Sequence, residues 1–264
     1  MCTYIFRTEK KYEENKDMFT FMHNSKLHRM SKIHLEIIAT NPESCLIANE
    51  NGATRLEVCS ALQVGGLTPA LSLIEYAVEY TTCDVAALIR IREGSFVYSE
   101  EEIKIMCNDI RRSKDKGIKA VVVGALNEDG TIDFRALEKF VKAANGIDVA
   151  FQRAFDVCTN GDEAIAQLES AGCKRLLSSG KKMTCVEGIY NLKRYASLAN
   201  TMEIMPGSGL RSSNIAQVYD ECFSSYHTSA SEIVHVGELG VMPKEYIRAN
   251  AEEVHAIAQF LSDK

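Results

Sequence analysis

The sequence predicts an α/β fold in which eight parallel strands, each followed by a helix, close into a (β/α)8 barrel of the TIM type. The first observation is a repeated unit: from Ile33 onward, a short β-branched run is followed by a turn and then by a longer amphipathic helix. The second is that eight such runs occur, and the third is their spacing of 21 to 34 residues, which accommodates one strand, one helix and two loops. A doubly wound open sheet is the alternative arrangement of the same elements.

The expected strands follow one another with no hairpin signal between them. In chain order they cover residues 34–39, 55–59, 85–91, 119–125, 149–155, 175–179, 202–206 and 225–229. Residues 1–31 mix basic and acidic side chains, unlike a signal or transit peptide, and we expect them to form a loosely ordered extension. The barrel is then a single domain over residues 32–264.

Capping residues mark the starts of four expected helices. Asn41-Pro42 and Thr68-Pro69 each place a capping side chain before a proline at the first helical position. Ser99 to Glu102 and Thr184 to Glu187 have the spacing of a capping box. After the eighth strand, a loop over residues 231–242 is long enough to cover one end of the barrel, and the last helix is expected over residues 243–262.

Composition and charge narrow the classes of partner. The chain of 264 residues carries a net charge of −6 and no Lys/Arg block, which argues against a nucleic-acid partner because such a partner requires a clustered basic face. No run approaches the roughly 18 apolar residues of a membrane span. Nine cysteines, without a C-x-x-C pair, are typical of reduced thiols. The sequence therefore predicts a cytoplasmic protein that binds a small molecule.

Charged side chains occupy the inward face of several expected strands. In R-L-E-V-C, residues 55–59, Leu56 and Val58 face the helices, so Glu57 and Cys59 face the barrel interior. A purely structural barrel fills its interior with Val, Ile and Leu, and interior residues near the carboxyl ends of the strands open into the active site. The residues that we expect to converge there are Glu36, Glu57, Arg90, Arg92, Gln152, Arg153, Asp156, Ser179 and His227.

These residue types suit acid–base chemistry on a small anion. The candidates for proton transfer are Glu57, Asp156 and His227. Arginines bind carboxylates or phosphates bidentately, and M-P-G-S-G-L, residues 205–210, offers backbone N–H groups where phosphate sites often lie in this fold. The expected ligand-binding residues are Glu36, Arg90, Arg92, Gln152, Arg153, Ser179, Gly207 and Gly209.

A structural interpretation of the same residues stays open. The acidic and basic side chains can form a buried ion-pair network that holds the strands in register. The two glycines can simply mark a tight turn, and a single histidine is often a structural residue. A lone buried cysteine such as Cys59 is more often a small hydrophobic residue than a metal ligand.

A series of motifs runs along the chain in a fixed order. They are G-A-T-R-L-E-V-C with G-G-L-T-P, I-R-x-R with F-V-Y-S, V-G-A-L-x-x-D-G-x-I-D, F-Q-R-A-F-D, L-S-S-G, E-I-M-P-G-S-G and a final H-x-S-A. The series, from about Ile33 to Ala230, resembles the CutC copper-homeostasis family. This resemblance implies a TIM-type barrel, a cytoplasmic location, a homo-oligomer and a role in copper handling through Cu(I).

Three positions depart from the family pattern. Ile38 stands where the family has a cysteine on the first strand, so Cys59 alone remains of the implied two-thiolate copper site. Gln152 replaces a histidine, and Ser95 replaces an aspartate. Linear coordination of Cu(I) then requires a second soft ligand from elsewhere. The candidates are Met205, Cys158 and Cys185.

Three functions therefore compete. The first is a CutC-like copper-homeostasis protein that binds Cu(I) through Cys59, with binding weakened by Ile38. The second is a TIM-barrel enzyme that acts on a small anionic substrate at the carboxyl ends of the strands. The third is a barrel without activity that serves as an interaction scaffold.

Overall fold

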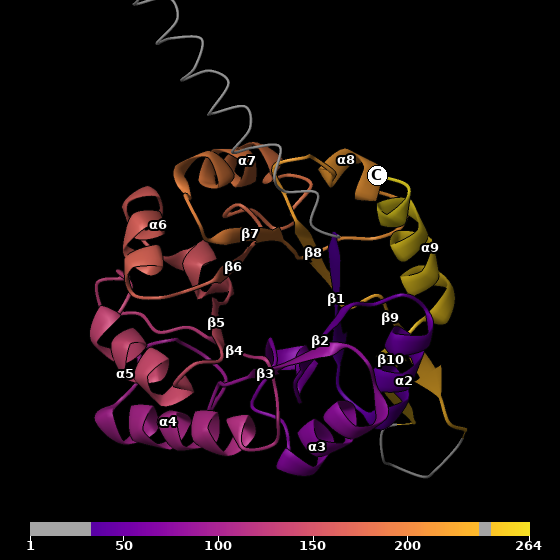
Figure 1. The fold of residues 1–264 in the computed structure, drawn as a ribbon, viewed down its shortest axis with the longest axis horizontal. Coiled ribbons are helices and arrows are strands. Elements are labelled where there is room, and N and C mark those ends of the chain that lie inside the picture. The colour runs from indigo at the N-terminus through magenta and orange to yellow at the C-terminus, as the bar shows by residue number, and fades with distance from the viewer. Residues whose placement is uncertain (1–32, 238–243) are drawn as a thin grey trace, which may run out of the picture. The chain divides into compact units, whose positions relative to one another are not determined.

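The computed structural model of the protein describes residues 33–237 and 244–264. The extension expected over residues 1–31 lies outside the described residues. Eight parallel strands form the central sheet, and their order around it is β7-β6-β5-β4-β3-β2-β1-β8. Six of the seven pairs of consecutive strands are hydrogen-bonded, and β8 pairs with β1. Figure 1 looks along the resulting ring, with helices around its outside. The predicted TIM-type barrel is confirmed.

The strands lie close to the predicted ranges, although most are shorter. They are β1 (His34–Ala39), β2 (Arg55–Val58), β3 (Asp84–Leu88), β4 (Ala120–Val123), β5 (Asp148–Phe151), β6 (Arg175–Ser178), β7 (Glu203–Pro206) and β8 (Ser225–Thr228). The helices are α2 (Pro42–Glu50), α3 (Leu71–Tyr80), α4 (Glu100–Lys114), α5 (Phe134–Ala144), α6 (Gly161–Ser170), α7 (Ile189–Leu198), α8 (Ile215–Val218) and α9 (Ala251–Ser262). Two 3-10 turns, η1 (Leu62–Val64) and η2 (Arg153–Val157), follow β2 and β5.

Two of the four predicted caps occur as expected. The Asn41 side chain accepts a hydrogen bond from the backbone N–H of Ser44 at 2.8 Å, with Pro42 in the first turn of α2. Ser99 and Glu102 form a complete capping box at the start of α4. Each such cap satisfies backbone N–H groups that have no partner inside the helix.

The other two caps were placed wrongly. Helix α3 begins at Leu71, and its N-cap position, Ala70, makes no side-chain hydrogen bond. Thr68 instead bonds the backbone of the segment after β3, because its Oγ1 accepts from Arg90 N at 2.9 Å and donates to Arg90 O at 3.1 Å. Thr184 accepts from Glu187 N at 3.3 Å, but this bond closes a turn, and α7 begins only at Ile189.

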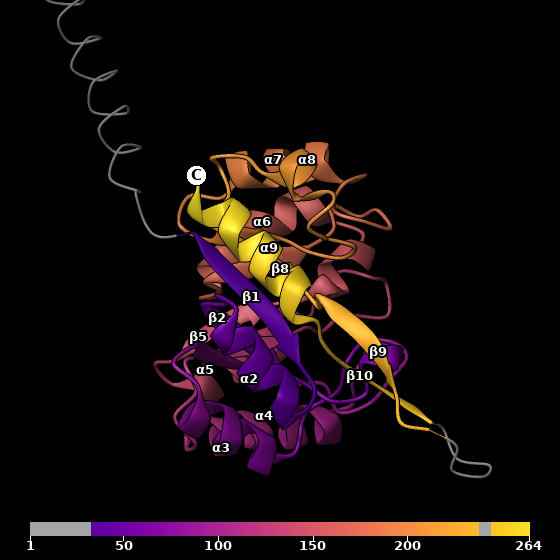
Figure 2. The same cartoon turned by 90° about the vertical axis from the view of Figure 1, so that its right-hand side faces the viewer.

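The segment after β8 also differs from the prediction. Residues expected as a loop and a helix start instead form an antiparallel hairpin of β9 (Ser231–His235) and β10 (Glu245–Ala249), which Figure 2 shows extending from the barrel. Arg248 on β10 forms ion pairs with Glu232 on β9 and with Glu43 on α2. The prediction missed the hairpin because its strands alternate in polarity but no two-residue turn signal joins them.

The core divides into two parts that follow the alternation of side chains along each strand. The larger part lies between strands and helices and includes Leu35, Ile37, Leu56 and Val58. A small apolar cluster fills part of the barrel interior, and its buried members are Cys59, Ala86, Leu88, Ala120, Val122 and Ala150. The rest of the inward face carries polar side chains, because β1, β2, β6 and β8 turn their charged residues inward.

The ring is nearly closed. In the described part of the chain, β7 and β8 share no strand ladder, although each pairs with its other neighbour. Two side-chain hydrogen bonds cross this junction. Ser224 donates to Glu203 Oε1 at 2.9 Å at one end, and Thr228 donates to the carbonyl of Leu210 at 2.8 Å at the other.

Candidate functional site

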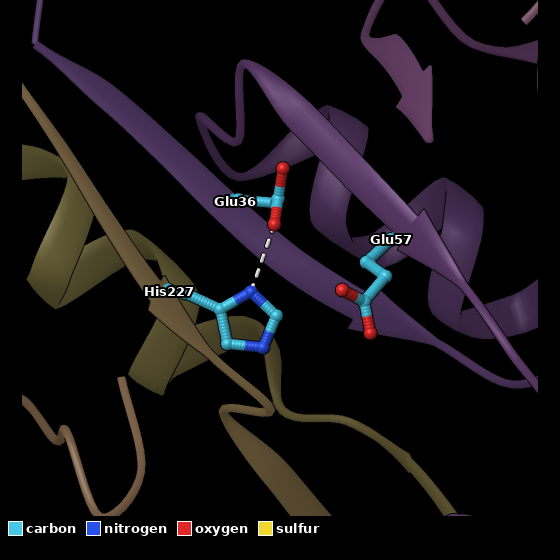
Figure 3. Close-up of side chains that lie close together, drawn as sticks. All are labelled: Glu36, Glu57 and His227. Carbon is cyan, nitrogen blue, oxygen red and sulfur yellow. Dashed lines mark hydrogen bonds and ion pairs between the residues drawn. The ribbon is translucent and has the colours of Figure 1, made fainter. Parts of the chain in front are cut away.

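Three polar side chains from neighbouring strands meet inside the barrel. Glu36 on β1 lies opposite His227 on β8 in the strand register, and Glu57 on β2 lies opposite the next inward residue of β1, Ile38. Ligand atoms of the three residues all lie within 4.8 Å of one another, and all three residues are buried. Figure 3 shows their side chains pointing into the same space. The predicted convergence therefore holds for these three residues.

Glu36 and His227 form an ion pair in which Glu36 Oε1 lies 2.9 Å from His227 Nδ1. Burial alone would raise the pKa of Glu36, but the hydrogen bond and positive charge of His227 outweigh it and lower that pKa. Burial would likewise lower the pKa of His227, yet its hydrogen bond to Glu36 and the negative charges of Glu57 and Glu36 raise it. Both shifts favour the carboxylate form of Glu36 and the imidazolium form of His227.

Glu57 differs from Glu36 because its carboxyl group forms no ion pair with any of the described residues. Its Oε2 atom is buried and accepts no hydrogen bond from the described residues. Burial raises the pKa of Glu57 to about 7, a rise that the charge of His227 limits and that of Glu36 increases. The cluster thus combines a fixed charged pair with one carboxyl group that changes protonation near neutral pH.

The predicted arginines Arg90 and Arg92 brace loops. The buried Arg90 guanidinium donates to the carbonyls of Val64, Gly66 and Gly94, and it stacks on Phe96 with 4.8 Å between Cζ and the ring centroid. Its Nε atom has no partner in the described chain. Arg92 forms an ion pair with Glu102 at 2.6 Å and donates to three carbonyls of its own loop. The protein itself therefore supplies partners for the positive charge of Arg92, and no ligand is needed to balance it.

Asp156 organises the loop after β6. Its carboxylate accepts hydrogen bonds from Ser178 Oγ at 2.6 Å, from Ser179 Oγ at 2.9 Å and from the backbone N–H groups of Ser179 and Lys181. Arg153 adds an ion pair at 2.8 Å, and it donates to Ser179 Oγ at 3.2 Å. Both carboxylate oxygens of Asp156 accept hydrogen bonds, so this residue holds the loop in position. Its expected role in proton transfer stays a prediction.

The turn after β7 passes close to His227. A methyl group added at Gly207 would lie 2.5 Å from Leu177 Cδ1 and 3.3 Å from His227 Cδ2, so a larger residue there requires these side chains to shift. Ser208 and Gly209 have positive φ angles of 76° and 71°. Within residues 33–237 and 244–264, no acceptor takes a hydrogen bond from the backbone N–H of either residue. These two N–H groups are therefore available to an anion.

Gln152 and Cys59 lie on the inward face. Gln152 is buried, and its Nε2 atom has no partner among the described residues. Cys59 is fully buried in the apolar interior cluster, against which Ile38 packs. Burial raises the pKa of the Cys59 thiol far above its usual range, and the nearby charge of Glu57 adds to this rise. The structure thus places Cys59 outside the cluster of Glu36, Glu57 and His227.

Sequence reasoning missed Arg175. This buried residue begins β6, and its positive charge helps to lower the pKa of Glu36 and limits the rise in the pKa of Glu57. The sequence did indicate its orientation. Side chains alternate along the strand R-L-L-S, so Arg175 lies on the same inward face as Leu177. The prediction considered only the carboxyl ends of the strands, whereas Arg175 lies at an amino end.

The fold and the buried cluster define a TIM-type barrel protein with a polar cluster of two carboxyl groups and one imidazole inside the ring. A family model described as CutC family matches residues 33–232. The chain belongs to the CutC family.

Curated relatives and a solved structure agree with this membership. The chain is 43% identical over 188 residues to a CutC family protein of Glaesserella parasuis serovar 5 (strain SH0165), covering 71% of this chain and 77% of that protein. It is 36% identical over 211 residues to one of Bacteroides fragilis, covering 79% and 84%. The crystal structure of CutC from Streptococcus agalactiae has a TM-score of 0.71 and 32% identity, over 75% of this chain and 98% of that chain.

More distant structures share the fold alone. An aldolase called QR15 has a TM-score of 0.58 at 12% identity, over 75% of this chain and 90% of that chain. Among the described residues, no helix has both the length and the apolar character needed to cross a membrane.

Proposed function

We propose that the chain is an enzyme that transfers protons to or from a small anionic substrate at the carboxyl ends of the barrel strands. The observation that carries this proposal is Glu57, a buried carboxyl group with an unpaired oxygen beside an imidazole that a second carboxylate holds. An acid or base works best when its pKa lies near the working pH. Burial raises the pKa of Glu57 to about 7, so this group both donates and accepts protons at neutral pH.

The neighbouring groups have complementary roles. Glu36 fixes the ring of His227 through Nδ1, and the positive charge of His227 stabilises negative charge that develops on the substrate. The free N–H groups of Ser208 and Gly209 bind the anionic group of the substrate, because backbone N–H groups in such turns suit carboxylates and phosphates. Arg153, whose side chain is 43% exposed, contributes a further positive charge at the rim.

A ligand screen tests the substrate class. Carboxylates, sugar phosphates and nucleotides are added to the protein, and the unfolding temperature is recorded for each. A ligand at 100 times its Kd stabilises the folded state by about 2.7 kcal/mol. A substrate found in this way is then turned over by wild type and by Glu57→Gln, and we expect a loss of roughly 100-fold or more in kcat.

The control replaces Glu138, an exposed residue of α5, by glutamine, which removes the same charge far from the cluster. No thermal shift with any of the three ligand classes would count against the anionic substrate. Unchanged turnover in Glu57→Gln would contradict the role of Glu57.

Copper handling is a second candidate, favoured by family membership. The Streptococcus agalactiae relative is described as a candidate copper homeostasis protein. Cu(I) prefers soft thiolate and thioether ligands, but Cys59 is a single thiol whose raised pKa disfavours the thiolate, and Ile38 packs against its cluster. The cluster of two carboxylates and one imidazole is not a soft donor set. These residues do not fit a two-thiolate Cu(I) site.

Competition titration with a Cu(I) chelator tests this candidate. Copper handling through Cys59 requires sub-micromolar binding that Cys59→Ser abolishes. The matched control is Cys45→Ser, which alters another buried thiol, located in the core between strands and helices. Stoichiometric binding that survives Cys59→Ser would exclude Cys59 as the ligand. A cytoplasmic location and a homo-oligomer, both implied by the family, remain predictions.

A further inference from the structure

A small recess lies at the amino-terminal end of the barrel, away from the turn of Ser208 and Gly209. It is lined by Arg175, Arg55, Lys119, Glu36 and Asp84, together with apolar residues of β3 and β4. We call it the N-terminal recess. Its enclosed part has room for about one particle of the size of a water molecule, and the remainder opens to solvent. The space therefore suits one small ligand.

Arg175 is the unusual residue of this recess. Only 6% of its surface is exposed, and its Nε atom is buried without a hydrogen-bond acceptor in the described part of the chain. Over the same residues, no carboxylate forms an ion pair with its guanidinium, although several acidic groups lie on neighbouring strands. A buried cation without a partner is strongly unfavourable, so this position calls for a negative charge.

Two of the nearby carboxylates are already engaged in other ion pairs. Glu203, opposite Arg175 in the strand register, pairs with Arg55 at 3.2 Å and accepts a hydrogen bond from Ser224 at 2.9 Å. Glu36 pairs with His227 at 2.9 Å. Asp84 lines the recess, but it is exposed, and so is Lys119. The guanidinium of Arg175 is thus the positive charge that the local ion pairs leave unmatched.

We propose that the N-terminal recess binds one small monovalent anion of about halide size, held by Arg175 with Lys119 at the rim. The two carboxylates that line the recess, Glu36 and Asp84, repel a multivalent ion such as sulfate or phosphate more strongly than a monovalent one. The anion supplies the missing counter-charge of Arg175, in the same barrel interior as Glu36. This inference is independent of the proposed enzymatic function.

Bromide is the probe, because it resembles chloride in size and charge and scatters X-rays anomalously. Crystals of the wild-type protein grown in sodium bromide should show an anomalous peak in contact with the Arg175 guanidinium. In solution, bromide should raise the unfolding temperature saturably relative to gluconate at the same ionic strength, since gluconate is too large for the recess. At ten times the apparent Kd we expect a rise of about 3–6 °C.

Arg175→Gln should lose this bromide-specific rise, and Arg135→Gln, which removes the same charge from an exposed position on α5, should retain it. An equal rise in wild type and Arg175→Gln would overturn the proposal. So would a water molecule at Arg175 with no anomalous signal in bromide-grown crystals. The crystal measurement needs only wild-type protein, so it decides the matter even if Arg175→Gln does not fold.

Discussion

Replacing Glu57 by glutamine should change how the stability of the protein depends on pH. The pKa of Glu57 is about 7 in the folded state and 4.5 for a glutamate in water, where the unfolded chain leaves it. Below pH 4.5 the group is protonated in both states. Between pH 4.5 and about 7 only the unfolded chain releases the proton, so the free energy of unfolding falls as pH rises.

The size of the effect follows from the same two values. Each unit of pKa difference corresponds to 1.36 kcal/mol, so the full cost of burying ionised Glu57 is about 3 kcal/mol and is present above pH 7. Glu57→Gln carries no such group. Its stability relative to wild type should therefore increase by about 3 kcal/mol between pH 4.5 and pH 8. The pair of Glu36 and His227 is present in both proteins and cancels to first order.

Urea unfolding followed by circular dichroism, at half-unit steps from pH 4.5 to pH 8, measures this difference. Only the change with pH matters, because glutamine alters packing and hydrogen bonding equally at every pH. Glu138→Gln is the control, and its stability difference from wild type should stay nearly constant. The quantity to compare is the free energy of unfolding of Glu57→Gln minus that of wild type. If it changes by less than about 0.5 kcal/mol between pH 4.5 and pH 8, the argument from burial is refuted.

Three further predictions concern other parts of the barrel. His227→Leu leaves Glu36 buried without its partner, so the free energy of unfolding at pH 7, measured by urea titration, should fall by about 3–5 kcal/mol. The double variant with Glu36→Gln should regain much of this lost stability. Arg90→Met removes three hydrogen bonds to carbonyls of two loops, so limited proteolysis should cut near residues 62–66 or 92–95 faster than in wild type, while Arg135→Met leaves cleavage unchanged. Ser99→Ala breaks the capping box of α4 and should lower the free energy of unfolding by about 1 kcal/mol, whereas Ser99→Asp should retain most of it.

The convergence of Glu36, Glu57 and His227 could be predicted because it depends only on strand order and the alternation of side chains. Once β8, β1 and β2 are neighbours, inward residues of matching register must meet. The pKa of Glu57 could not be predicted in the same way, because it depends on burial and on the absence of a cation at its Oε2 atom. Both properties are set by how the whole ring packs.

The arginines show where reasoning from strand position ends. Arg90 and Arg92 follow β3, where a ligand-binding residue is expected, yet their side chains contact carbonyls of loops whose paths no periodicity reveals. Thr68 failed as a cap for the same reason, since its hydroxyl bonds the backbone at Arg90, 22 residues away in sequence. The inward orientation of Arg175 could be predicted from the alternation of side chains along its strand. Its lack of an ion-pair partner could not, because that depends on which neighbouring carboxylates already pair with other residues.

The junction between β7 and β8 makes the barrel a rolled sheet with two facing edges. Separating those edges disrupts two side-chain hydrogen bonds worth about 1 kcal/mol each, whereas parting any other two neighbouring strands breaks a continuous backbone ladder. His227 sits on one of these edges and Gly207 follows the other. The imidazole of His227 therefore lies beside the junction of the described ring that no backbone ladder holds.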